Sequence, residues 1–220
     1  MEDVLDVYEL PYNPKRPVVG FDEKPYQLIQ DVFQPIQAKP GRVKLEDYEY
    51  ERLGTANLFG WVEPLTGNRD VWVTERRTKL DYAQALKRLS EAFPDADVIM
   101  VVQDNLNTHS KAALYEAFPA AEAHALAKRF EFHFTPKRPR PVRCRFGVKK
   151  HGSWLNVQEL EWAALAKQAL RARVGDAVAL AGVVAPWVLN RRTRAVLIDW
   201  QFRSVDAQVK LKRLYPIFTV

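Results

Sequence analysis

The sequence predicts an α/β protein in which a mixed, roughly five-stranded sheet is covered by helices on both faces. Three observations support this fold class: apolar runs of strand length alternate with amphipathic segments, one run (97–103) is apolar almost throughout, and two aromatic-rich stretches flank a turn. A chain of 220 residues with 47% hydrophobic content can bury a substantial core. We therefore expect a single domain over residues 1–220.

The first three strands are predicted early in the chain. The run VVGFDE is short, apolar and ends in acid, which indicates a strand that ends at Asp22. Residues 47–75 contain two aromatic and β-branched stretches around the turn PLTGN, a hairpin pattern. Within it, Val71 and Val73 should face one side of the sheet and Trp72 the other.

Helices and strands then alternate. Thr78 and Asp81 form a capping-box pattern at the start of an amphipathic helix, and the run 97–103 indicates a strand buried on both faces. The other expected elements are helices over 110–118 and 119–128, a half-buried strand over 130–134, helices over 154–172 and 176–189, an extended stretch over 195–202 and a basic helix over 205–214.

The charge is concentrated in one segment. Lys137–Lys150 holds seven basic residues and no acid, and without these charges the formal net charge of +6 becomes −1. This distribution indicates a local surface for an anionic partner. The single cysteine, Cys144, excludes an internal disulfide and a cysteine-based zinc site, which fits the cytoplasm. No apolar run is long enough for a transmembrane helix, and the acidic N-terminus is unlike a signal peptide, so we expect no membrane partner.

Three acids follow ordered elements at places where a side chain would emerge: Asp22, Asp104 and Glu159. The first two can be neighbours if their strands are adjacent and parallel, because ligands gather outside the carboxyl ends of strands. Glu23 should point to the opposite face from Asp22. Glu161 lies about 200° around the helix from Glu159 and cannot share its target.

Three carboxylates suit two Mg²⁺ or Mn²⁺ ions, which prefer oxygen ligands and can promote in-line phosphoryl displacement. Each acid also has a structural interpretation. Asp22 can be a turn residue, and Asp104 can form an Asx-turn into the next helix. Glu159 can form a helix N-terminal cap with Asn156.

Several segments together resemble a known family. They are GFDEK, YEYERLGTANLF, DNLNTH, FHFTPK, HGSWLN followed by Glu159, and the closing DWQF and KLKRLYP. In this order they resemble the DDE transposases of bacterial insertion sequences, in the branch related to Tc and mariner elements. The resemblance runs across nearly the whole chain.

The resemblance implies a ribonuclease H-like fold, two divalent ions and a catalytic and metal-binding triad of Asp22, Asp104 and Glu159. It also implies cleavage at transposon ends and attack of the freed 3′-hydroxyl on target DNA. The family's N-terminal helix-turn-helix region is expected to be absent here. The 13 residues Arg138–Lys150 interrupt the family pattern, and without this insert the 54 residues between Asp104 and Glu159 become 41, close to the family spacing.

DNA is the expected partner, with a possible homodimer in the DNA complex. The candidate DNA-binding residues are Asn105, Asn107, His109, Lys137, Arg138, Arg140, Arg143, Arg145, Lys149, Lys150 and His151. For His109, a positioning hydrogen bond is favoured over direct catalysis. Two further hypotheses stay open: a catalytically silent remnant that at most binds DNA, and another ribonuclease H-like nuclease such as a junction resolvase.

Overall fold

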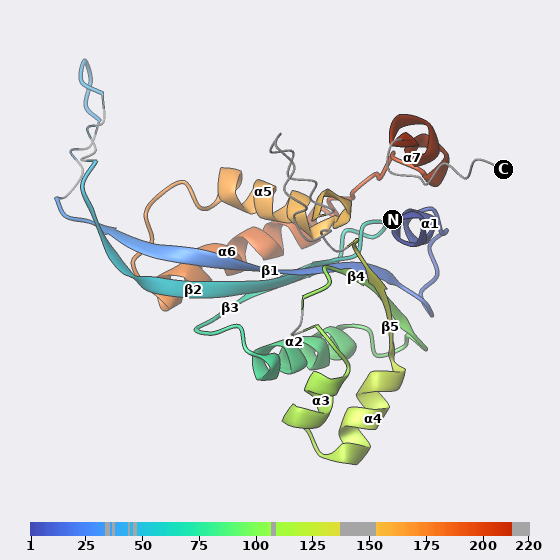
Figure 1. Ribbon diagram of the computed structural model, residues 1–220. Coiled ribbons are helices and arrows are strands. Elements are labelled where there is room, and N and C mark those ends of the chain that lie inside the picture. Colours follow the sequence, from blue (N-terminus) through green and yellow to red (C-terminus); the bar gives the residue numbers. More distant parts are fainter. Residues whose placement is uncertain are drawn as a thin grey trace, which may run out of the picture.

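A five-stranded mixed sheet forms the centre of the molecule (Figure 1). The computed structural model describes residues 1–33, 36, 38–43, 45, 48–106, 109–136 and 153–212. The strands are β1 (Val18–Asp31), β2 (Tyr50–Val62), β3 (Arg69–Thr74), β4 (Ile99–Gln103) and β5 (Phe130–Phe134). Their order is β3-β2-β1-β4-β5, antiparallel among β1, β2 and β3 and parallel from β1 through β4 to β5. The predicted mixed sheet is confirmed.

Helices cover both faces of this sheet, as predicted. They are α1 (Glu2–Tyr8), α2 (Lys79–Ala92), α3 (Ala112–Ala117), α4 (Ala120–Lys128), α5 (Gln158–Gln168), α6 (Ala177–Thr193) and α7 (Ser204–Lys210). The sequence patterns did not predict α1. Among the described residues, no helix is both long and apolar enough to cross a membrane.

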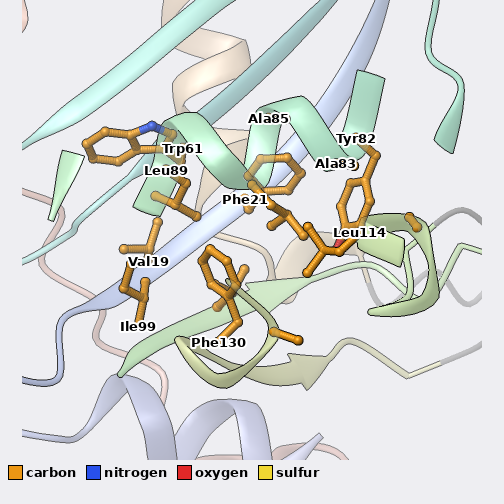
Figure 2. Close-up of a cluster of buried hydrophobic side chains, with 14 of the residues drawn as sticks. Val19, Phe21, Trp61, Tyr82, Ala83, Ala85, Leu89, Ile99, Leu114 and Phe130 are labelled. Atoms are coloured by element: carbon orange, nitrogen blue, oxygen red, sulfur yellow. The ribbon is translucent and has the colours of Figure 1, made fainter. Parts of the chain in front are cut away.

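The first face packs against α2, α3 and α4 and buries a core of large apolar side chains (Figure 2). Strand alternation decides which residues take part: Val19 and Phe21 of β1 and Val101 of β4 point into this core. The helix α2 contributes Tyr82, Leu86 and Leu89, and it begins with the predicted capping box of Thr78 and Asp81. Trp72 packs on this face and Val71 on the other, also as predicted.

The second face carries α5 and α6 over β1, β2 and β3, and α1 and α7 beside β4. Both neighbours of Val101, Met100 and Val102, pack here, which explains why the whole of β4 is buried. At the β2–β3 turn, Gly67 has a positive φ of 75°, and a side chain there would meet the backbone of Val196.

Two sequence expectations differ from the structure. Residues 195–202 form neither a helix nor a strand; this segment binds the hairpin turn through the Ile198 N–H and Pro64 carbonyl. Helix α5 begins at Gln158 instead of Trp154, because Ser153–Leu155 is a separate 3₁₀ turn. Both segments are short and rich in apolar residues, and a short apolar run alone does not define its backbone conformation.

Candidate active site

Asp22 lies inside β1, not at the end of this strand as predicted. Strand β2 pairs with β1 from Gly20 to Asp31, whereas the parallel pairing with β4 ends at Gly20. Asp22 is therefore just beyond the last parallel pair, where the side of β1 that faced β4 becomes open. The apolar run in the sequence marked the end of this doubly paired part and not the end of the strand.

Asp104 follows β4 directly, at the same edge of the sheet. The last registered pair between the two strands joins Gly20 to Val102. Two residues further along each strand are Asp22 and Asp104, so a continued register makes them neighbours. The condition that their strands be adjacent and parallel is confirmed.

The segment before α5 is anchored on β1. The Asn156 side-chain amide donates a 2.8 Å hydrogen bond to the Phe21 carbonyl, and its oxygen accepts a 3.1 Å bond from the backbone N–H of Gln158. A Cβ atom at Gly20 would lie 2.3 Å from Val157, so glycine is required for this close approach. Glu159, in the first turn of α5, is thereby held next to β1.

Trp162 connects α5 to Asp22. Its indole N–H donates a 2.9 Å hydrogen bond to the Asp22 carboxylate, and the ring is buried. The sequence patterns gave Trp162 no role at this site, although its position three residues after Glu159 places both on one helical face. Gly60, the β2 partner of Asp22, leaves room for this ring, since a Cβ there would lie 2.6 Å from it.

The electrostatic setting of Asp22 is unfavourable for its charged form. Burial is the largest cause, and together with the negative charges of Glu159 and Asp104 it raises the pKa of Asp22 to about 7, although the Trp162 hydrogen bond lowers it in part. The three predicted carboxylates thus act on one another electrostatically. Within the described part of the chain, however, no three acidic, histidine or cysteine side chains converge closely enough to hold one metal ion.

The two excluded acids point elsewhere, as predicted. Glu23 is on the opposite face of β1, 3.5 Å from His109 and 3.6 Å from Arg77. Glu161 is buried away from Asp22, where Arg69 and Arg191 pair with it at 3.0 and 2.7 Å.

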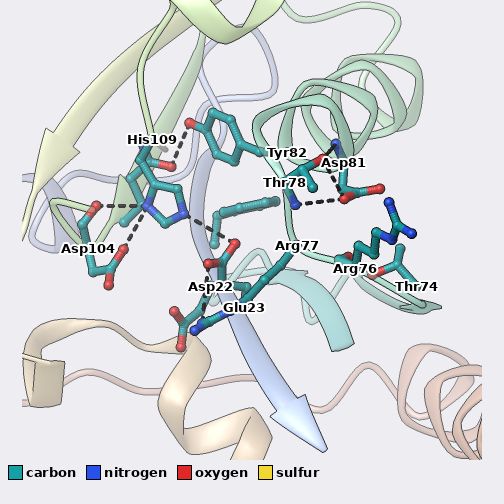
Figure 3. A network of polar contacts seen from close by, with 12 residues as sticks. Asp22, Glu23, Thr74, Arg76, Arg77, Thr78, Asp81, Tyr82, Asp104 and His109 are labelled. Carbon is teal, nitrogen blue, oxygen red and sulfur yellow. Dashed lines mark hydrogen bonds and ion pairs between the residues drawn. The ribbon is translucent and has the colours of Figure 1, made fainter. Parts of the chain in front are cut away.

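His109 contacts Asp104 through one nitrogen of its ring (Figure 3). Its Nδ1 atom lies 2.7 Å from a carboxylate oxygen and 3.0 Å from the carbonyl oxygen of Asp104. Burial lowers the pKa of the ring, but the hydrogen bonds with Asp104 and Glu23 outweigh it and raise the pKa to about 10. Since the side chain is buried, its placement fits the positioning role and not a DNA-contacting surface.

The other candidate DNA-binding residues are less informative. Asn105 is exposed beside Asp104. The remainder lie outside the described residues: Asn107, Lys137, Arg138, Arg140, Arg143, Arg145, Lys149, Lys150 and His151.

Solved structures share the fold. The crystal structure of the Mos1 strand transfer complex matches with a TM-score of 0.52 and 14% identity, over 89% of this chain and 57% of that chain. A pre-cleavage Mos1 transpososome (TM-score 0.30, 14% identity, 89% and 61% covered) is less similar. A simian T-cell lymphotropic virus intasome in complex with PP2A regulatory subunit B56 gamma is also less similar, with a TM-score of 0.34 and 11% identity over 87% of this chain and 53% of that chain. Neither of these two matches supports a fold assignment. The first match and the sheet order confirm the ribonuclease H-like fold.

Sequence comparison identifies the family. No curated protein sequence matches the chain. The family model described as DDE superfamily endonuclease matches residues 17–181, about three quarters of the chain, and this range includes all three candidate carboxylates. The chain belongs to the DDE superfamily endonucleases.

Proposed function

We propose that this domain is the catalytic part of a cut-and-paste transposase, which cleaves DNA at transposon ends and joins the freed 3′-hydroxyl to target DNA. The family match supports an endonuclease, and the similar fold found in a Mos1 strand transfer complex supports strand transfer. The main structural support is that the charges of Asp104 and Glu159, which come from two other parts of the chain, both act on the buried Asp22 carboxylate.

Their chemistry fits a divalent metal ion. All three donors are carboxylate oxygens, the ligands that Mg²⁺ and Mn²⁺ prefer. The raised pKa of Asp22 reflects first its burial and then the negative charges of Glu159 and Asp104, and a bound cation would compensate these charges. Two such ions would supply an activated attacking oxygen and a stabilised leaving oxygen. Like charges repel at ligand distance, so full convergence of the carboxylates needs the cations.

The protein's own residues orient these donors. Trp162 holds one oxygen of Asp22, and His109 holds Asp104 through its Nδ1 atom. Glu159 is only partly buried, and its carboxylate has no hydrogen-bond or ion-pair partner among the described side chains. This leaves Glu159 free to bind an ion, and it disfavours the capping interpretation, because Asn156 bonds Gln158 and Phe21 instead.

Plasmid nicking with Mg²⁺ or Mn²⁺ tests the proposal. We expect Glu159→Gln to reduce nicking at least about 100-fold, because a neutral amide is a much weaker ligand for a hard cation. Glu122→Gln is the control, since Glu122 pairs with Lys87 at 2.8 Å on the other face of the sheet and should nick like the wild type. Equal nicking by wild type and Glu159→Gln would remove Glu159 from the mechanism.

A further inference from the structure

A chain of polar contacts leads from Asp104 to β1 (Figure 3). It begins at Asp104, passes through both nitrogen atoms of His109 and reaches Glu23 on the opposite face of β1 from Asp22. The proposed function uses the Asp104 carboxylate and leaves Glu23 without a role.

Burial makes Glu23 conspicuous. Its side chain is 4% exposed, and a carboxylate in such a place is costly without a compensating partner. Arg77 is 3.6 Å away and is itself 48% exposed, so it gives weaker compensation than Glu161 receives from its two arginines. The closest buried polar neighbour of Glu23 is the His109 ring, with Nε2 3.5 Å from its carboxylate.

Packing alone does not fix the orientation of that ring. His109 stacks on Tyr82 with ring centroids 4.7 Å apart and meets the edge of Phe21 at 6.4 Å. Stacking fixes the plane of an imidazole. A half-turn of the ring about its Cβ–Cγ bond keeps this plane but exchanges the nitrogen and carbon positions, at almost no packing cost. The Asp104 carbonyl binds Nδ1 on one side of the ring, and the Glu23 carboxylate fixes the same orientation on the other side, because it attracts Nε2–H and not a ring carbon.

A fixed ring in turn holds Asp104. Asp104 lies just after β4, and its side chain is 32% exposed, so the strand does not restrain the carboxylate. Tyr82 adds rigidity through a 2.9 Å hydrogen bond from its hydroxyl to Gln103, the preceding residue.

We propose that Glu23 is a positioning residue for the Asp104 carboxylate and acts through His109. This inference rests on the proposed function, because it assigns to Glu23 the orientation of one metal ligand. Partners of this kind, which bind a ligand from behind, typically change metal affinity by about 10- to 100-fold when they are removed.

Calorimetric titration of Mn²⁺ into the wild type and four variants, Asp104→Ala among them, tests the inference. Glu23→Leu should bind at least about tenfold more weakly than wild type. Glu23→Gln keeps the size and one acceptor oxygen, so it should fold normally and lose less affinity. Glu63→Gln is the matched control, because Glu63 is also a buried carboxylate but contacts Thr66 in the β2–β3 turn; it should bind like wild type.

The ring itself gives a second, metal-free measurement. In a nitrogen-edited NMR spectrum, the proton on Nδ1 of His109 should exchange slowly in wild type and Glu63→Gln, because it is buried and hydrogen-bonded. In Glu23→Leu, ring flips should broaden or remove this signal.

The outcomes separate this inference from the proposed function. If Asp104→Ala abolishes Mn²⁺ binding but Glu23→Leu binds like wild type with an unchanged His109 signal, the inference is wrong and the metal site stands. If Asp104→Ala binds Mn²⁺ as well as wild type, the proposed metal site fails, and the role of Glu23 fails with it.

Discussion

Two buried carboxylates, Glu161 of α5 and Asp22 of β1, differ in the charges that surround them. Glu161 is paired with Arg69 and Arg191, which supply positive charge within 3.0 Å. Asp22 is also buried, yet among the described residues its contacts are the neutral Trp162 and the repelling charges of Glu159 and Asp104. Both acids lie in the same layer of the fold, so burial alone does not distinguish their roles.

The protein provides positive charge for Glu161, whereas the charged groups that act on Asp22 are negative. Arg69 also donates to the carbonyls of Gly67 and Val196, so the Glu161 ion pair ties α5 to the hairpin turn and the segment after α6. This network is complete within the chain and therefore structural. Asp22, in contrast, has no positive partner among the described residues, which supports the proposed cation site.

Breaking the complete network should have the largest effect on stability. Glu161→Leu leaves the Arg69 guanidinium buried without its partner, and we expect the free energy of unfolding to fall by about 3–5 kcal/mol. Urea denaturation measures this loss. The control is Glu116→Gln, which removes an exposed pair with Lys79 and should cost less than about 1 kcal/mol. Similar small losses in both variants would show that the buried pair does not anchor α5.

Sequence patterns predicted much of this arrangement. The apolar runs indicated β1 and β4, and Asp22 and Asp104 were expected to be neighbours on the condition that these strands are adjacent and parallel. The structure meets this condition. Strand periodicity excluded Glu23, and helix geometry excluded Glu161.

The partners of these acids were beyond sequence reasoning. Trp162 and Arg69 act through contacts between residues far apart in the chain, as does His109 in its contact with Glu23, and no local pattern encodes such contacts. The contact of His109 with Asp104 spans only five residues and fits the positioning role expected from the sequence. The full length of β1 was missed for a related reason. After Glu23 this strand is largely solvent-facing and pairs with β2 alone, so it lacks the continuous apolar run that marks a buried strand.

Removing the charge of Asp22 should change stability in the opposite direction. Without divalent ions at pH 8, we expect Asp22→Asn to be more stable than wild type by roughly 1–3 kcal/mol. The asparagine oxygen can still accept the Trp162 hydrogen bond, but it carries no buried charge. Urea denaturation in EDTA measures this difference, and Mn²⁺ should then stabilise wild type and not the variant.

The pH dependence of that gain follows from the pKa of Asp22. This pKa is raised from 3.8 to about 7 in the folded protein, so folding retains a proton that the unfolded chain has released. The contribution of Asp22 to wild-type stability is fully present below pH 3.8 and is lost as pH rises to about 7. The advantage of Asp22→Asn should therefore be larger at pH 8 than at pH 5. A constant or shrinking advantage would contradict the assignment.

The smallest expected effect on stability concerns the neutral side-chain amide of Gln158, whose polar atoms have no hydrogen-bond partner among the described residues. Gln158 is fully buried next to Gly60. Methionine has a similar size and no such polar atoms, so Gln158→Met should raise the free energy of unfolding by about 1 kcal/mol. Gln103→Met is the matched control with the opposite sign, because it removes the acceptor of the buried Tyr82 hydroxyl. If both variants lose stability equally in urea, the Gln158 amide is hydrogen-bonded in solution. Between α5 and β1, the comparison with Glu161 then rests on Asp22 alone among the described residues.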